Sequence, residues 1–151
     1  MTTYESEIKT IAQPQELVFN TLSDLSNLKK VQNIDLEGNQ KAAQYFKDIT
    51  FDSDSVSFSF AGIGQVGFRI IKREPFKTIK LQAENSPVGA YGWIQLLPIS
   101  DNSCKMKITI KAKLPMMIKM MADSKLKKGI NTIADAIVEA MNDLQTDLPN
   151  P

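Results

Sequence analysis

Residues 104–144 read CKMKITIKAKLPMMIKMMADSKLKKGINTIADAIVEAMNDL, and this stretch decides the fold. Up to Leu114, apolar side chains alternate with lysine or threonine, which is the pattern of a strand with one buried face. From Pro115 onward the spacing of apolar residues becomes helical. One stripe contains Leu126, Ile130, Ile133, Ile137, Met141 and Leu144. The sequence therefore predicts a strand over 103–113 that leads directly into one long helix over 115–144.

The predicted helix is long for a chain of 151 residues. At a rise of about 1.5 Å per residue it spans about 43 Å, whereas a compact chain of this length has a radius of gyration of about 15 Å. The helix must therefore cross the whole molecule. Its apolar stripe is the natural cover for the buried face of a sheet.

Short β-type segments separated by turn residues fill the middle of the chain, as in an antiparallel meander. The strands are predicted over 43–51, 55–61, 65–74, 77–84, 91–99 and 103–113. In 55–61, Val56, Phe58 and Phe60 alternate with serines, so this strand has one buried and one solvated face. Both phases of 91–99 are apolar. Gln95 favours even positions inward, which puts Trp93 on the outer face.

The N-terminal part begins with a period-two segment over 3–12, which predicts a first strand with Tyr4, Ser6, Ile8 and Thr10 on one side. Pro14 then opens a short helix, and Ser23-Asp24 ends it and caps a second short helix through Leu25, Leu28 and Val31. Residues 34–42 are expected to form a loop. Residues 145–151 are expected to be a flexible tail, which leaves 1–144 as a single domain.

Composition and charge exclude several classes of function. Cys104 is the only cysteine, so the chain has no disulfide framework, and a reducing compartment fits best. Eighteen basic and seventeen acidic residues leave a charge of +1, far from the excess expected of a nucleic-acid partner. No export signal and no uninterrupted apolar run of about 18 residues is present. We therefore expect a cytoplasmic protein without a transmembrane segment.

Few residues suit catalysis or metal binding. The chain contains no histidine, which excludes Ser-His-Asp and Cys-His triads and leaves carboxylates as the main metal ligands. Asp48, Asp52 and Asp54 cluster near a predicted turn. A solvated turn is the favoured interpretation of this cluster, and an ion site is the alternative. Cys104 is expected to be a buried core residue. We assign no catalytic residue, no metal ligand and no cofactor.

Three segments carry a resemblance to a known superfamily. They are I-x-x-P-x-x-x-V-F-x-x-L-S-D-L-S-N-L at Ile11 to Leu28, R-E-P-F-K-T-I-K-L at Arg73 to Leu81, and L-x-P with a polar turn at Leu96 to Asn102. With the order of predicted elements, the whole chain resembles the START-like, helix-grip (SRPBCC-type) superfamily. This superfamily includes the birch-pollen allergen, polyketide cyclases and many bacterial proteins.

The resemblance implies an α+β helix-grip fold. In this fold a curved antiparallel sheet of about seven strands, with two short helices, wraps around one long C-terminal helix. It also implies a hydrophobic cavity between sheet and helix, which relatives use for lipids, isoprenoids, steroids or polyketides. The leading functional hypothesis is therefore binding of a hydrophobic or amphipathic small molecule. From strand alternation and the helical stripe, the predicted cavity residues are Phe58, Phe60, Phe68, Ile79, Leu81, Leu126, Ile130, Ile133 and Ile137.

Two other functions stay open. A polyketide cyclase or aromatase would need a polar group inside the cavity, and Tyr4, Tyr45 and Thr10 are the candidates. A protein-interaction module of the chaperone-activator kind would need a large exposed apolar patch, which Trp93 and Leu97 could supply.

Strand parity predicts where a ligand would enter. In a meander, alternate connections lie at the same end of the sheet, and one end collects apolar loop residues. The predicted cavity mouth contains Ile63, Val88, Met116 and Met117, with transient membrane contact as one interpretation. The alternatives are that these loop side chains plug that end, and that the methionines at 116, 117, 120 and 121 are ordinary core rather than an adaptable mouth.

Overall fold

The structure of the protein is a computed structural model, which describes residues 1–29 and 45–144. The strands are β1 (Thr2–Glu5), β2 (Lys9–Ile11), β3 (Phe46–Phe51), β4 (Ser55–Phe60), β5 (Gly64–Glu74), β6 (Thr78–Glu84), β7 (Gly89–Ser100) and β8 (Ser103–Lys113). The helices are α1 (Gln15–Leu22), the 3-10 helix η1 (Leu25–Leu28) and α4 (Met116–Asn142). Val31, the predicted loop over 34–42, the start of the strand predicted from residue 43, and the predicted tail over 145–151 lie outside the described residues.

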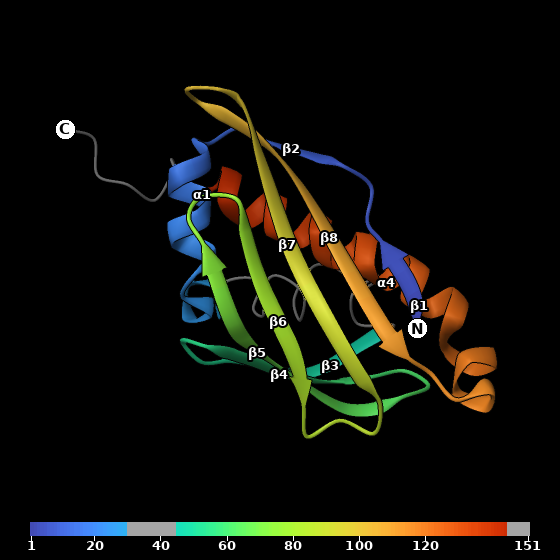
Figure 1. Cartoon of the computed structure of the whole chain (residues 1–151). Coiled ribbons are helices and arrows are strands. Elements are labelled where there is room, and N and C mark those ends of the chain that lie inside the picture. Colours follow the sequence, from blue (N-terminus) through green and yellow to red (C-terminus); the bar gives the residue numbers. More distant parts are fainter. Residues whose placement is uncertain (30–44, 145–151) are drawn as a thin grey trace.

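The strands form one curved antiparallel sheet in the order β1-β8-β7-β6-β5-β4-β3, and β2 also pairs with β8. Figure 1 shows α4 crossing behind the sheet, with α1 beside one end of it. The predicted α+β helix-grip architecture is confirmed. The predicted ends of the sheet are confirmed as well, because strictly antiparallel pairing from β3 to β8 puts alternate connections at the same end.

The first predicted strand is interrupted. Glu5 pairs with Thr109, and Lys9 pairs with Met106. An advance of four residues along the N-terminal segment therefore corresponds to an advance of only three along β8. The extra residue reverses which side chains face inward, as a β-bulge does. Tyr4 and Ser6 are buried as the alternation requires, but Ile8 is 65% exposed and Ile11 is fully buried. Placing Ile8 and Thr10 on the same side as Tyr4 was therefore wrong.

Ser6 makes the bulge possible. Its backbone N–H donates to the carbonyl of Ile108 at 2.8 Å, and its hydroxyl accepts from the N–H of Ile108 at 2.9 Å. The side chain thus takes the place of a backbone carbonyl that the bulge has turned away. A buried N–H needs such a partner, because an unsatisfied one loses the free energy of its hydration.

The helix α4 is held against the sheet by its apolar stripe. Ile130, Ile137 and Met141 are buried, whereas Ile133 is half-buried. Gly129 lies in the same face, and a Cβ atom there would approach the ring of Phe60 to 3.1 Å. The glycine therefore lets an aromatic ring from β4 pack directly on the helix backbone.

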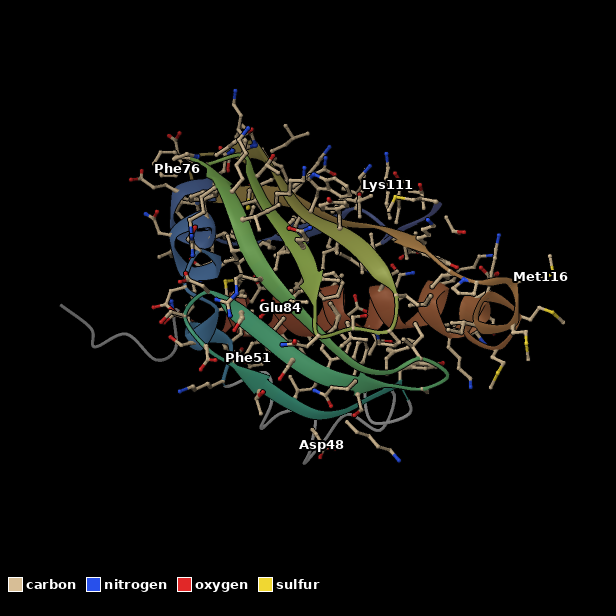
Figure 2. All side chains as sticks on the ribbon, turned by 60° about the horizontal axis from the view of Figure 1, so that its bottom comes forward. Asp48, Phe51, Phe76, Glu84, Lys111 and Met116 are labelled. Atoms are coloured by element: carbon tan, nitrogen blue, oxygen red, sulfur yellow. The ribbon has the colours of Figure 1, made fainter. Side chains whose placement is uncertain are left out.

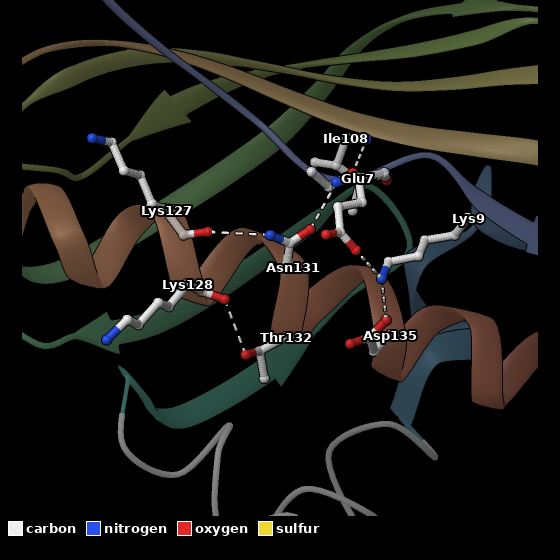
Figure 3. Close-up of polar contacts among 9 residues, drawn as sticks. Glu7, Lys9, Ile108, Lys127, Lys128, Asn131, Thr132 and Asp135 are labelled. Atoms are coloured by element: carbon white, nitrogen blue, oxygen red, sulfur yellow. Dashed lines mark hydrogen bonds and ion pairs between the residues drawn. The ribbon is translucent and has the colours of Figure 1, made fainter.

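Polar contacts fasten the N-terminal segment to the other side of α4 (Figure 3). The N–H of Glu7 donates to Oδ1 of Asn131 at 2.7 Å, and Lys9 forms ion pairs with Glu7 at 3.2 Å and Asp135 at 2.8 Å. The carboxylates of Glu7 and Asp135 are largely exposed, and ion pairs near the surface contribute about 1 kcal/mol or less each. These contacts therefore help to determine the position of α4 but add little to the free energy of unfolding.

The short helices begin near the positions that the sequence predicts. Pro14 precedes α1, and the carboxylate of Asp24 caps η1 by accepting from the N–H of Ser26 at 3.0 Å. Trp93 lies on the outer face as expected, with the amines of Lys80 and Lys111 within 5.6 and 5.8 Å of its ring. Within the described ranges, no helix is long and apolar enough to cross a membrane.

Candidate functional site

A cavity of about 170 Å³ lies between the sheet and α4. Aromatic side chains from β3, β4 and β5 form one wall. Phe46 meets Phe58 and Phe60 edge to face at 5.3 and 5.1 Å, and Phe58 stacks with Phe68 at 6.4 Å. The stripe of α4 forms a second wall through Leu126, Ile130, Ile133 and Ile137.

The third wall comes from β7 and β8 and explains why a space exists. Its inward positions include Ala90, Gly92 and Ala112. A Cβ atom on Gly92 would have Leu81 and Phe68 no closer than 3.9 Å. Small side chains opposite a bulky aromatic wall leave volume that the packed ends of the sheet do not have. The alternation in 91–99 and 103–113 put Gly92 and Ala112 inward, whereas Ala90 lay outside the predicted strand. The alternation marked none of the three as cavity lining.

The structure brings most of the sequence-predicted cavity residues to the walls of the cavity. The cavity is lined by Phe58, Phe60, Phe68, Leu81, Leu126, Ile130, Ile133 and Ile137. Whether they contact a ligand stays a prediction. Ile79 is a correction: it is fully buried in the core and does not line the cavity. It pairs with Ile94 nearer the β5–β6 turn, at the end of the sheet where α1 packs against β7 and occupies the space.

The predicted mouth residues separate into two groups. Ile63 and Val88 turn inward and line the cavity, as the plug alternative describes. Met116 and Met117 do not line it and are 79% and 78% exposed. The reason is their place at the start of α4, on the side of the helix away from the buried Ala122. Their exposure also makes the core alternative for the methionines wrong.

Tyr4 is the polar side chain that the fold brings to the cavity. Its hydroxyl donates to Oδ1 of Asp123 at 2.7 Å, and Asp123 also pairs with Lys127 at 3.1 Å. Burial, followed by the bond to Asp123, raises the pKa of Tyr4 well above its usual value. The bond from Tyr4, followed by that from Lys127, lowers the pKa of Asp123. The hydroxyl of Tyr4 is therefore a neutral donor that already has an acceptor.

The other two polar candidates do not reach the cavity. Thr10 is exposed because the bulge at Ser6 reverses the phase of β2. Tyr45 stacks on Phe60 at 6.4 Å between ring centres and is not part of the wall. Sequence alternation could not separate these residues from Tyr4, because it gave no reason to place one of the three in the cavity rather than another.

The remaining candidates for chemistry are engaged in structural roles. Cys104 is fully buried, and burial raises the pKa of its thiol, which disfavours the reactive thiolate. Asp54 pairs with Arg73 at 2.6 Å, and Arg73 also donates to the carbonyl of Ser23. Among the described residues, no three aspartate, glutamate or cysteine side chains come together as a metal site would require.

Sequence comparisons give no assignment: no family model matches the chain, and no curated protein matches it. Solved structures do match. A conserved protein from Geobacillus kaustophilus has a TM-score of 0.62 at 16% identity, covering 94% of this chain and 93% of that one. Norcoclaurine synthase from Thalictrum flavum has a TM-score of 0.66 at 13% identity, covering 98% and 95%.

A START superfamily protein from Mycobacterium smegmatis has a TM-score of 0.61 at 11% identity, covering 94% of this chain and 98% of its own. At these identities the likeness concerns the fold alone. It extends over nearly the whole length of each chain, and it agrees with the order of strands and helices described above. The chain therefore has the START-like, helix-grip fold.

Proposed function

We propose that the cavity binds a hydrophobic or amphipathic small molecule. The observation that carries this proposal is the chemistry of the wall. Among the described residues that line it, Tyr4 and Trp93 alone have a nitrogen or oxygen in the side chain. The Tyr4 hydroxyl is already bonded to Asp123, and the Trp93 ring lies beside lysines of the outer face. Such a space favours apolar atoms, because polar groups would lose their water without gaining a partner.

The volume narrows the class of ligand. At about 170 Å³ the cavity is close in size to an engineered apolar cavity of about 150 Å³ that takes benzene. A compact isoprenoid or a small aromatic, polyketide-like molecule fits this volume better than a long lipid chain does. Ile133 and Phe68 line the cavity but are only half-buried. A bound ligand would therefore cover apolar surface that is exposed in the empty cavity.

The enzyme alternative depends on Tyr4. Norcoclaurine synthase is an enzyme with the same fold, and a reaction in this cavity would need a group that moves a proton. The raised pKa makes Tyr4 a weaker acid than an ordinary tyrosine, and its proton is shared with Asp123 rather than directed at the cavity. Binding is therefore the function that this geometry supports best.

The cytoplasm is still the compartment in which we expect the protein to act.

Binding can be tested with N-phenyl-1-naphthylamine, an uncharged dye that fluoresces in apolar surroundings. Ile133→Trp would fill the cavity from α4, and Ile99→Trp is the matched control, because Ile99 is 48% exposed and does not line the cavity. We expect the wild type and Ile99→Trp to bind the dye with similar Kd. We expect Ile133→Trp to bind at least about tenfold more weakly, which corresponds to about 1.4 kcal/mol.

Circular dichroism of both variants checks that they are folded. Equal dye binding by Ile133→Trp and the wild type, or no dye binding by the wild type, would count against the proposal. Native mass spectrometry of protein from its own source then identifies the natural ligand by its mass.

A further inference from the structure

Four methionines project from the start of α4 into solvent. Met116, Met117, Met120 and Met121 are 79%, 78%, 80% and 61% exposed. We call this group the methionine tip. Figure 2 shows Met116 at the far end of the molecule, directed away from the sheet. Methionine is normally among the buried residue types, and an exposed apolar group of this kind marks an interaction surface.

Helix geometry makes the methionine tip one continuous surface. Residues three and four apart are neighbours on a helix, so Met116 lies beside Met120, and Met117 lies beside both Met120 and Met121. Ala122, in the same turns, is fully buried against the β4–β5 connection, where a Cβ atom on Gly62 would lie 3.5 Å from it. The orientation of this part of α4 is thus determined by packing, and the methionines cannot turn inward.

Lysines lie in the sequence on both sides of the methionine tip. The whole chain has a charge of +1, but between residues 111 and 128 the only acidic residue is Asp123. The same segment contains Lys111, Lys113, Lys119, Lys125, Lys127 and Lys128. Lys127 and Lys128 are exposed on the outward side of α4, two turns after Met120 and Met121. Lys127 also pairs with Asp123 at 3.1 Å, and Lys128 lies beside it. An apolar tip with a border of lysines is the arrangement that binds to anionic lipid surfaces.

From this combination we infer that the methionine tip docks on the surface of an anionic membrane. The thioether side chains insert among the acyl chains near the headgroups, and the lysines pair with lipid phosphates and carboxylates. A second copy of this chain is a poorer occupant, because it would bring the same lysines into contact with each other. An acidic protein would satisfy the lysines but would also need an apolar groove shaped to the methionines, a requirement that the fluid acyl chains of a bilayer do not impose.

The docking surface adjoins one end of the cavity. Ile63, Val88 and Leu114 line that end, and Leu114 is separated from Met116 by Pro115 alone. Docking would therefore place this end of the cavity at the lipid surface. The inference goes beyond the proposed function and does not depend on it, because membrane binding through the tip needs no ligand in the cavity.

The test is sedimentation of the full chain with vesicles of two compositions. One is phosphatidylcholine alone, and the other is equal parts of phosphatidylcholine and phosphatidylserine. We expect binding to the anionic vesicles, with the affinity at least tenfold lower on phosphatidylcholine alone. It should also fall at high salt, because charge attraction is screened over about 3 Å at 1 M salt, against about 10 Å at 0.1 M.

Two double variants locate the surface. Met117→Ser with Met120→Ser removes half of the methionine tip, and binding to anionic vesicles should weaken at least tenfold. Leu97→Ser with Ile99→Ser is the control, because these residues are 64% and 48% exposed near the β7–β8 turn, at the opposite end of β8. The control variant should bind as the wild type does. Both variants should bind N-phenyl-1-naphthylamine with the wild-type Kd.

Three results would overturn the inference. Failure of the wild type to bind anionic vesicles would do so, as would equal vesicle binding by the methionine variant. Sedimentation velocity without lipid adds one more outcome: a wild-type dimer that the methionine changes dissociate would make a second copy the occupant. A failure of dye binding with intact vesicle binding would instead remove the proposed function and leave this inference standing.

Discussion

Tyr4 is the residue at which the chemistry of the cavity can be tested directly. Its hydroxyl is bonded to the carboxylate of Asp123, a residue 119 positions away in the sequence, across the gap between β1 and α4. The bond links the first strand to the first half of the long helix. The folded state holds the proton of Tyr4 tightly mainly because burial disfavours the ionised form. Ionisation would also lose the bond to Asp123 and put a second negative charge beside it.

This arrangement predicts the stability of the protein in alkali. The pKa of Tyr4 is raised in the folded state, so its contribution to the free energy of unfolding is fully present below the ordinary tyrosine value of about 10. It is lost as the pH rises through the folded value. Urea unfolding between about pH 8 and 11 should show a steeper loss of stability for the wild type than for Tyr4→Phe, since this window spans that ordinary value. Parallel pH profiles would show that the pKa of Tyr4 is not raised in the folded state.

Among the secondary-structure elements, the break between β1 and β2 shows how one side chain maintains a sheet edge. The bulge turns a backbone carbonyl away from β8, and the hydroxyl of Ser6 accepts the N–H of Ile108 in its place. The same irregularity lets Tyr4 and Ile11 both point inward although they are seven positions apart, an odd number. Without it, the strict alternation of a strand would expose one of the two.

Ser6→Ala should therefore destabilise the protein by about 1–3 kcal/mol, because it leaves a buried N–H without an acceptor. The measurement is urea unfolding followed by circular dichroism. Ser59→Ala is the matched control, since its hydroxyl bonds to Gln65 on an exposed part of β4, and it should change stability by no more than about 0.5 kcal/mol. Equal losses in the two variants would mean that the hydroxyl of Ser6 is not the required acceptor.

Considered as a whole molecule, the protein has a packed end and an open centre. Toward the β5–β6 turn, α1 packs against β7 and Ile79 is fully buried. The middle of the sheet instead faces α4 across a cavity of about 170 Å³. An empty apolar cavity lowers stability, because its lining lacks contacts on one side. A ligand that fits should therefore stabilise the fold as well as bind to it.

A ligand at 100 times its Kd should raise the free energy of unfolding by about 2.7 kcal/mol. For a domain of about 150 residues this corresponds to a rise in Tm of about 5–10 °C. Differential scanning fluorimetry with a series of isoprenoid and aromatic compounds measures the shift, and the compound with the largest shift indicates the ligand class. The cavity-filled variant Ile133→Trp should show little shift with the same compounds, and an undiminished shift in it would place the binding elsewhere.

The sequence by itself determined the order of the elements and the side that each one buries. Alternation in 55–61 and 103–113, and the stripe from Leu126 to Met141, are local periodicities that any packing partner must accept. From them follow the meander of strands, the long helix that covers it, and the inward position of Phe58 and Phe68. The helix-grip architecture came from the resemblance to a known superfamily, and the outer position of Trp93 came from the phase of Gln95. Local patterns were sufficient because each of these features depends on residues a few positions apart.

The tertiary structure alone decided which buried residues meet the cavity and which exposed ones form a surface. Ile79 and Leu81 share one face of β6, but only Leu81 lines the cavity, because α1 packs at one end of the sheet. The methionine tip is exposed because it lies on the side of α4 away from the contact between Ala122 and the β4–β5 connection. Ile8 is exposed because of one extra residue before β2. Each outcome depends on which residue of a distant element lies opposite, and periodicity along the chain contains no information about that.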